Sequence, residues 1–278
     1  MYHVLVVGAG YTGSRIARYF KDQKQKVWAV TRTGKRNDEF EKGGITPVIA
    51  DLTRTETLAA IPPVHFIVLC PAPDEGSEEN YRKIYIEGIQ NFLHSRVGKP
   101  RPSFILYISS TAVWRPREGG WVDENTAPDP ETEKGRILAQ AEKNILESGY
   151  PSAVFRLAGI YGPGRNRLRV LESGKISQEE NSYMNMIHVD DVVRAVPVLF
   201  KKGAIGEVYT GVDDRPVLRS DFYRELGELT GKKVDFNFLG SSGGKKCRNT
   251  KLKMLGFEFL YPTFREGYES LLNKTNNL

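Results

Sequence analysis

The sequence predicts a doubly wound α/β fold, in which helices cover both faces of a parallel sheet. Three observations lead to this prediction: short unbroken apolar runs, amphipathic stretches between them, and a glycine-rich turn directly after the first run. Strands of a parallel sheet are buried on both faces, so they appear as continuous apolar runs. The expected strands span residues 4–7, 27–30, 46–49, 66–69, 104–108 and 153–155.

The segments between the apolar runs have the spacing of helices. In residues 14–23, 78–97 and 131–148 the apolar side chains recur every three or four positions, which places them on one helix face. Strands that alternate with such helices are typical of strand–helix–strand units, whose strands run parallel. The first half of the chain is therefore expected to form most of the sheet.

From about Gly159 the alternation becomes less regular. Residues 188–200 predict a helix and residues 206–212 a further strand. Ser220 is expected to cap another helix, which Gly231 would end. We therefore expect a core and a smaller C-terminal lobe. The core is assigned residues 1–160 and about 187–212, and the lobe about 161–186 and 213–278.

Composition narrows the class of protein. With 40% apolar and 27% charged residues, the chain resembles globular proteins rather than disordered or fibrous ones. The longest apolar run, residues 66–72, is far shorter than the roughly 20 residues of a membrane span. Met1 leads almost directly into the first strand, so no secretory signal is expected. Only Cys70 and Cys247 are present, too few for a secreted disulfide framework, which favours a cytoplasmic location.

A phosphate-binding turn is predicted between the first strand and the first helix. Gly8, Gly10 and Gly13 form the pattern G-x-G-x-x-G, with Tyr11 and Thr12 inside it. The first glycine allows the tight turn, the second lets a pyrophosphate approach the backbone, and the third permits close packing of helix on strand. Free N–H groups at the helix start would face the phosphates. A purely structural glycine turn is the alternative, but the buried strand before it and the helix after it favour a dinucleotide site.

The end of the second strand indicates which dinucleotide binds. An NAD site usually has a carboxylate there for the ribose 2'-hydroxyl, whereas an NADP site has an arginine for the 2'-phosphate. This segment contains Arg32, Lys35 and Arg36, and no acid occurs before Asp38. Arg32 therefore favours NADP over NAD, although an arginine on a solvated turn would give the same pattern.

Further cofactor contacts are expected at the carboxyl ends of the next two strands, where open α/β sheets bind ligands. Asp51 and Leu52 end the third strand and would lie at the edge of the adenine. Cys70, Pro71 and Ala72 end the fourth, and these small or rigid residues would let the cofactor pass close by. We interpret Cys70 as a buried small apolar residue rather than a redox thiol.

Five stretches of the chain are together similar to one known family. They are GAGYTGSRIA, YISSTAVW, FRLAGIYGPGR, NMIHVDDVVRAV and GEVYTGVDDRPV. In these the chain resembles the extended short-chain dehydrogenases/reductases, which include nucleotide-sugar epimerases and dehydratases. The resemblance implies a Rossmann core with a small substrate lobe. It also implies that Ser110 and Thr111 lie beside the reacting hydroxyl or carbonyl group, and Ser109 beside the cofactor. A Ser/Thr cluster that satisfies loop backbone groups is the other interpretation.

The Tyr-Lys pair that this family uses for proton transfer is missing. Relatives carry the two residues four positions apart on the next helix, where the lysine and the cofactor lower the tyrosine pKa from its usual value near ~10. The corresponding helix begins within residues 131–142, and no tyrosine occurs between Tyr107 and Tyr150. This departure resembles the atypical branch of the family, which keeps the dinucleotide fold without the usual active-site residues.

Two alignments of this helix stay open. If it is aligned on Glu142, Lys134 takes the tyrosine position and Leu138 the lysine position. If Arg136 replaces the lysine instead, Thr132 takes the tyrosine position. Lys134 is the candidate acid/base residue, with an exposed helix-surface lysine as the alternative.

The resemblance also implies where the substrate binds, which is beside the loop after the sixth strand. Tyr161, Arg165 and Arg167 lie in this loop, and arginine forks suit phosphate oxygens. A solvated basic surface would explain the same arginines. A nucleotide-linked substrate also agrees with the net charge of +6. The histidines are scattered along the chain, so no metal site is expected.

Two functions are consistent with these features. The first is an NADP-dependent oxidoreductase or epimerase/dehydratase-like enzyme that acts on a nucleotide sugar or a related hydroxyl or keto compound, with a nonstandard acid/base set. The second is a catalytically silent NADP(H)-binding sensor or regulatory protein, which the missing pair favours. Neither nucleic acid nor membrane is an expected partner, because the chain contains no motif of the known nucleic-acid-binding modules. The oligomeric state is left open.

Overall fold

A computed structural model describes residues 1–173, 181–233 and 243–275 of the chain. Its largest element is a seven-stranded sheet in the order β11-β7-β5-β4-β1-β2-β3. Adjacent strands from β3 to β5 pair in parallel, which confirms the predicted doubly wound fold. The strands are β1 His3–Val7, β2 Lys26–Thr31, β3 Thr46–Ile49, β4 Phe66–Leu69, β5 Phe104–Ser110, β7 Ser152–Leu157 and β11 Val208–Gly211.

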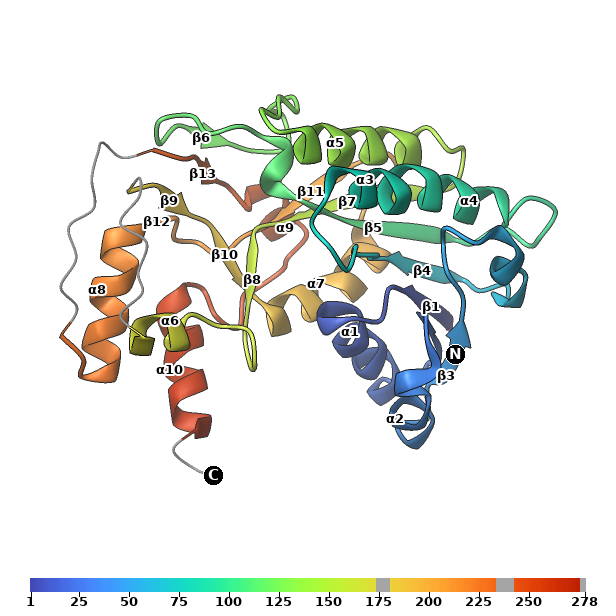
Figure 1. Ribbon diagram of the computed structural model, residues 1–278, viewed down its shortest axis with the longest axis horizontal. Helices are drawn as coiled ribbons and strands as arrows, with labels where there is room; N and C mark the ends of the chain where they lie inside the picture. The colour runs from blue at the N-terminus through green and yellow to red at the C-terminus, as the bar shows by residue number, and fades with distance from the viewer. Residues whose placement is uncertain (174–180, 234–242, 276–278) are drawn as a thin grey trace. The chain divides into compact units, whose positions relative to one another are not determined.

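Helices cover both faces of this sheet (Figure 1). On one face Phe200 of α7 stacks on Phe66 of β4 with ring centroids 4.7 Å apart, and also contacts Phe20 of α1. On the other face Phe92 of α4 and Ile145 of α5 join the main apolar cluster. Each face thus has its own buried layer of side chains. The helices around the sheet are α1 Tyr11–Asp22, α2 Asn37–Lys42, α3 Glu78–Arg82, α4 Ile89–His94, α5 Glu133–Leu146 and α7 Val189–Lys202.

Short helical turns complete these connections. They are the 3₁₀ helices η1 Gly34–Arg36, η2 Thr55–Ala60 and η4 Thr111–Val113, and the π-helical segment η3 Lys83–Gly88. The π-helical segment joins α3 directly to α4, within the single helix that the sequence predicts over residues 78–97. Such segments are rare and often occur at functional sites.

The strand order reverses direction between β1 and β4. The chain runs outward from β1 through β2 to β3, then returns to the other side of β1 as β4. The connections that leave β1 and β4 therefore diverge, and they open a crevice at the carboxyl ends of these strands. The glycine-rich turn follows β1 and Cys70 follows β4, so both predicted cofactor segments lie at this point.

The chain divides into two compact units. One consists of residues 1–113, 128–156 and 193–209, and the other of residues 114–127, 157–192 and 210–278. The second unit thus includes residues 114–127, which the sequence assigned to the core. Its strand pairs are β6 Trp121–Val122 with β13 Lys246–Cys247, β8 Gly159–Tyr161 with β10 Met186–His188, and β9 Tyr183–Met184 with β12 Val217–Leu218. Its helices are α6 Leu168–Ser173, α8 Arg219–Thr230, α9 Thr250–Met254 and α10 Phe264–Thr275.

The start of α8 differs from the prediction. The helix begins at Arg219, so Ser220 lies inside its first turn and is not the N-cap. Asn181 satisfies this end instead, because its Oδ1 accepts the Ser220 N–H at 3.0 Å and its Nδ2 donates to the Ser220 hydroxyl at 3.1 Å. Asn181 is remote in the sequence, which is why local capping rules missed it. Gly231 ends the helix with φ of 67°, as predicted.

Candidate dinucleotide and active site

The three glycines after β1 differ in what surrounds them. Gly8 has φ of +92°, and a Cβ there would lie 2.4 Å from the carbonyl oxygen of Cys70. A Cβ at Gly13 would lie 2.3 Å from the carbonyl oxygen of Gly8. At Gly10 nothing lies within 4 Å of the Cβ position. The first and third glycines are thus required by the fold, whereas the second keeps a space open beside the turn.

The N-terminus of α1 faces this open space with its N–H groups uncapped. Gly10 is the N-cap and supplies no side-chain acceptor, and no acidic residue lies in the first turn. Tyr11 and Thr12 begin the helix. Arg15 donates to the Tyr11 carbonyl at 2.8 Å, and its guanidinium lies 3.9 Å from the centre of the Tyr11 ring. Helix dipole and arginine together make this end positive, so the turn fits the pyrophosphate of a dinucleotide.

Two arginines follow β2. Arg32 forms an ion pair with Asp74. Arg36 donates to the carbonyl oxygen of Ala9 at 2.7 Å and to both carboxylate oxygens of Glu39 at 2.8 Å. The hydrogen bonds to Glu39 raise the Arg36 pKa. Arg36 thus lies against the glycine-rich turn itself. From the sequence, Arg32 alone was predicted to contact the cofactor, although the acid-free stretch after β2 includes both arginines.

The segments after β3 and β4 have mainly structural contacts. Asp51 Oδ1 accepts the N–H and the hydroxyl of Thr53, at 2.9 and 2.8 Å. Leu52 is buried, and a Cβ at Gly88 would lie 2.9 Å from it. The Cys70 thiol donates to the Gly8 carbonyl at 3.3 Å, and burial raises its pKa to about 12. Cys70 therefore stays protonated near neutral pH, as expected of a packing residue rather than a redox thiol.

Ser109 belongs to a buried charged network. Its hydroxyl donates to Glu142 Oε1 at 2.6 Å. Arg156 donates to the same carboxylate through Nε at 3.0 Å and Nη2 at 2.7 Å. The side chains of Glu142 and Arg156 are each 4% exposed. This network connects the end of β5 to α5 and β7. The Ser109 hydroxyl proton is used in this structural contact.

The candidate catalytic hydroxyls follow Ser109 directly. Ser110 is half-buried, and its Oγ accepts the N–H of Ala112 at 3.1 Å. Thr111 begins the 3₁₀ turn η4 and is half-buried. The Ser110 hydroxyl still has its own proton to donate, because the contact with Ala112 uses it as an acceptor.

The structure shows different contacts for the residues that the two alignments of α5 put at the catalytic positions. Thr132 is the N-cap, and its hydroxyl accepts the Gly135 N–H at 3.1 Å. Arg136 donates to Glu133 at 2.8 Å. Both residues of one alignment therefore have structural roles. Lys134 is half-buried, and its Nζ lies 5.4 Å from the centre of the Tyr81 ring.

The predicted substrate residues lie in the second unit. Tyr161 is 4% exposed, and its ring stacks on Tyr268 with centroids 5.1 Å apart. Arg165 exchanges two backbone hydrogen bonds with Gly162, and Arg167 donates to the Tyr223 hydroxyl at 3.3 Å. This packing favours a core role for Tyr161, and a role in substrate binding stays a prediction for all three residues.

The sequence model of the NAD-dependent epimerase/dehydratase family matches residues 4–210, from β1 to β11. The chain belongs to this family. A dinucleotide-binding Rossmann fold therefore accounts for the glycine-rich turn and the crevice beside it.

Similar proteins agree with this family. Protein YeeZ of Escherichia coli (strain K12) is 28% identical over 275 residues, which cover 94% of this chain and 97% of YeeZ. A solved structure from Methylobacillus flagellatus, described as a candidate NAD-dependent epimerase/dehydratase, is 28% identical and covers 99% of both chains with a TM-score of 0.84. MoeE5, solved with UDP-glucose and NAD, is 20% identical with a TM-score of 0.80 over 99% of both chains, a likeness that shows the shared fold.

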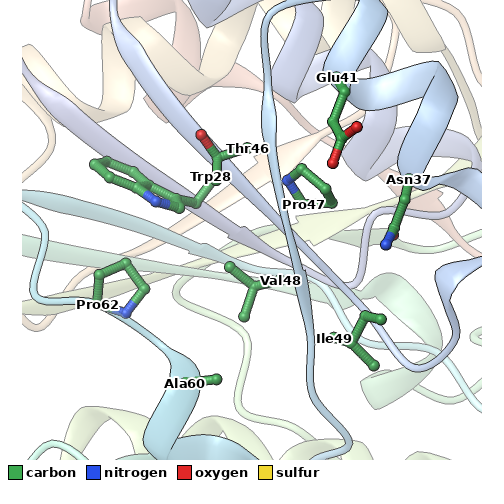
Figure 2. A pocket seen from close by; sticks show the side chains of 9 residues that line it. All are labelled: Trp28, Asn37, Glu41, Thr46, Pro47, Val48, Ile49, Ala60 and Pro62. Atoms are coloured by element: carbon green, nitrogen blue, oxygen red, sulfur yellow. The ribbon is translucent and has the colours of Figure 1, made fainter.

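A shallow hollow of about 540 Å³ lies beside the edge strand of this epimerase/dehydratase-family sheet. Figure 2 shows Trp28 of β2, with Val48 and Ile49 of β3, as its apolar walls, and Ala60 and Pro62 at its other side. None of the predicted site residues is among the side chains that line it. The hollow is therefore separate from the glycine-rich turn.

No helix of the described residues is long and apolar enough to span a membrane. Residues 1–173, 181–233 and 243–275 contain no group of three His, Cys, Asp or Glu side chains that could hold a metal ion.

Asp213 is a buried carboxyl group in the second unit of the family fold. Its Oδ1 accepts the Arg215 N–H at 3.1 Å. Its Oδ2 is buried and has no hydrogen-bond partner among the described residues. Burial raises the Asp213 pKa well above its ordinary value. The folded chain therefore holds this proton to a higher pH than the unfolded chain does.

Asp213→Asn should raise the melting temperature at neutral pH. The unfolded aspartate has a pKa of about 3.9 and the folded one a higher pKa, so folding stability is greatest below the unfolded value and falls as pH rises toward the folded value. Asparagine keeps an acceptor for Arg215 and removes this decline. Melting curves across pH test this: the two proteins should melt alike in acid and separate as pH rises. Parallel curves at every pH would contradict it.

Proposed function

We propose that the protein is an NADP-preferring oxidoreductase or epimerase/dehydratase-like enzyme that acts on a nucleotide sugar or a related hydroxyl or keto compound. The observation that carries this proposal is the glycine-rich turn, which is open at Gly10 and has Arg36 bound to its backbone at Ala9. An arginine in this place suits a 2'-phosphate, whereas a carboxylate would suit a free ribose hydroxyl.

The residues of the first unit support distinct roles around the cofactor. The backbone of residues 8–13 and the start of α1 would hold the pyrophosphate, and Arg32 and Arg36 the 2'-phosphate. The bound nicotinamide would supply hydride chemistry. Ser110 would donate its hydroxyl proton to the reacting oxygen, and so orient it.

The substrate class rests on charge and on similar folds. MoeE5 has been solved with UDP-glucose and NAD, and a UDP-glucose 4-epimerase of Thermotoga maritima with UDP-glucose. Arg165 and Arg167 offer cations for phosphate groups in the second unit, and the chain carries a net charge of +6. A nucleoside diphosphate sugar combines the hydroxyl groups and the anionic charge that these features suit.

Arg32→Gln combined with Arg36→Gln should weaken NADPH binding much more than NADH binding. Each arginine would lose hydrogen bonds to a phosphate, worth about 1.5–3 kcal/mol, or roughly tenfold or more in Kd per arginine. NADH lacks the 2'-phosphate and should bind almost unchanged. Fluorescence titration of both dinucleotides measures the ratio. Arg101→Gln is a matched control, because Arg101 precedes β5 and donates to the Gly149 carbonyl, which precedes β7. An equal loss for both dinucleotides would contradict the NADP preference.

Turnover is tested with a panel of nucleoside diphosphate sugars. Each sugar is incubated with NADP⁺ or NADPH, and reduced nicotinamide is followed by absorbance while the sugars are separated by chromatography. We expect redox change or a new sugar with at least one compound. Tight NADPH binding without turnover of any sugar would count against an enzyme.

A catalytically silent NADP(H) sensor is the second candidate. The observation that favours it is the structural use of Thr132 and Arg136, a helix cap and an ion-pair partner, which one of the two alignments puts at the positions of the catalytic pair. A sensor must change its conformation or its partner affinity between NADP⁺ and NADPH. Hydrogen exchange of both complexes tests this, and identical protection patterns would rule out sensing.

A further inference from the structure

The structure brings a phenol beside α5, although α5 itself has no tyrosine. Tyr81 of α3 lies under the ammonium group of Lys134, whose Nζ is 5.4 Å from the centre of its ring. We propose that Tyr81 and Lys134 together form the acid/base pair of this protein, with Tyr81 as the proton-transferring group and Lys134 as the cation that stabilises its phenolate. The proposal rests on the proposed function.

Lys134 is available for this role. It makes no ion pair with any carboxylate in the described part of the chain, whereas its neighbours Glu133 and Arg136 pair with each other. It is half-buried, so its charge is less screened by water than that of an exposed lysine. A Cβ at Gly76 would lie 3.6 Å from its Nζ, so a glycine leaves space beside the ammonium group.

An ion pair beside Tyr81 and Lys134 holds the two helices together. Arg82, which follows Tyr81, pairs with Glu133, which precedes Lys134. Glu133 also accepts from Arg136 at 2.8 Å, and these hydrogen bonds and charges lower the Glu133 pKa. The carboxylate therefore stays charged over a wide pH range and bridges α3 to α5. This bridge fixes which residues of the two helices face each other.

The pair lies on the cofactor side of the sheet. The Tyr81 ring is 5.2 Å from that of Tyr85, and Tyr85 packs against the apolar cluster that contains Leu69 of β4. Cys70, which follows β4, contacts the Gly8 carbonyl. On the α5 side, a Cβ at Gly135 would lie 2.8 Å from the carbonyl of Ala112, just beyond Ser110. Tyr81 and Lys134 are thus placed between the carboxyl ends of β4 and β5.

Tyr81 suits proton transfer better than the buried phenols Tyr85 and Tyr107. Burial raises the pKa of both Tyr85 and Tyr107, which keeps these phenols protonated. The Tyr107 hydroxyl is also buried without a hydrogen-bond partner among the described residues. Tyr81 is half-buried, and its hydroxyl makes no hydrogen bond within the described residues. It can therefore meet a substrate oxygen without giving up an existing partner.

When a substrate alcohol is oxidised, its O–H proton passes to the Tyr81 phenolate, while its carbon gives up a hydrogen with both bonding electrons to an oxidised nicotinamide dinucleotide. The products are a carbonyl compound, the neutral Tyr81 phenol and the reduced dinucleotide, and reduction of a carbonyl reverses each transfer. Lys134 keeps its protons throughout and stabilises the negative charge on the phenolate oxygen.

The first test needs no substrate. Tetranitromethane nitrates tyrosine through its phenolate, and peptide mapping locates the product. With the full-length protein at mildly alkaline pH, Tyr81 should nitrate faster than the more exposed Tyr2, and NADPH should slow the reaction at Tyr81 but not at Tyr2. Lys134→Gln should remove the preference for Tyr81, whereas Lys143→Gln on the same helix should keep it. Nitration of Tyr81 no faster than of Tyr2, or unchanged in Lys134→Gln, would overturn the proposal.

The second test uses any sugar that the panel above converts. Tyr81→Phe and Lys134→Gln should each lower kcat by about 10²-fold or more, with NADPH affinity unchanged. Tyr2→Phe and Lys143→Gln are the matched controls and should keep full activity. Full activity in Tyr81→Phe would overturn the pair but leave the proposed function standing. Failure of every sugar with the parent protein would instead refute the proposed reaction, and nitration would then decide on the pair by itself.

Discussion

Gly10→Val is expected to abolish dinucleotide binding and to leave the melting temperature close to that of the parent protein. The Cβ position at Gly10 has nothing within 4 Å, and its φ of −76° is open to any residue. The valine side chain would fill the space through which a pyrophosphate reaches the start of α1. Loss of two hydrogen bonds to phosphate, at about 1.5–3 kcal/mol each, raises Kd at least roughly 10²-fold.

Two further variants make this result specific. Gly10→Ala, with a smaller side chain, should weaken NADPH binding less than valine does. Gly8→Ala should instead destabilise the fold, because its φ is +92° and its Cβ would lie 2.4 Å from the Cys70 carbonyl oxygen. Calorimetric titration and thermal melting separate the two effects. Strong NADPH binding by Gly10→Val would mean that the pyrophosphate does not lie against this turn.

The glycine-rich turn and the strands beside it could be predicted from the sequence because their causes are local. A buried strand leaves a continuous apolar run. Gly8 and Gly13 leave no room for a side chain, and Gly10 keeps the approach to the start of α1 open. The parallel sheet followed from the same pattern, since strands that alternate with helices form strand–helix–strand units. The start of α8 was predicted less well, because its cap comes from Asn181 rather than from Ser220.

The contacts that give the candidate site its chemistry could not be predicted in this way. Arg36 can be found in the sequence, but its hydrogen bond to Ala9 cannot, because a helix and a strand separate the two residues along the chain. Tyr81 and Lys134 lie on α3 and α5, and the chain forms β5 between these two helices. From the sequence, Tyr161 and Tyr183 were the candidates for a phenol outside the helix that carries Lys134, whereas the fold brings Tyr81 of α3 to it. Tyr161 was predicted to bind substrate because of its position in the loop after the sixth strand, and the sequence did not indicate that its ring stacks on Tyr268.

Glu142→Ala is expected to cost about 3–5 kcal/mol of unfolding free energy, the usual result of removing one partner of a buried ion pair. Glu142 and Arg156 are each only 4% exposed, so the variant would leave the Arg156 guanidinium in the core without its carboxylate. It would also remove the acceptor of the Ser109 hydroxyl. Urea unfolding measures this loss, and a cost below about 1 kcal/mol, the level of an exposed pair, would show that water reaches the network.

Replacing both partners should recover most of this stability, because Glu142→Leu with Arg156→Met leaves no buried charge behind. The comparison separates two roles of the network. If the ion pair only fills the core, the double variant should resemble the parent protein in both stability and NADPH affinity. If it also positions the end of β5, stability should return but turnover of a converted sugar should be lower. The reason is that Ser109 would have lost its acceptor, so that the neighbouring Ser110 would be held less firmly. A rise in KM without a fall in kcat would argue against that positioning role, since Ser110 is expected to act on the reacting oxygen.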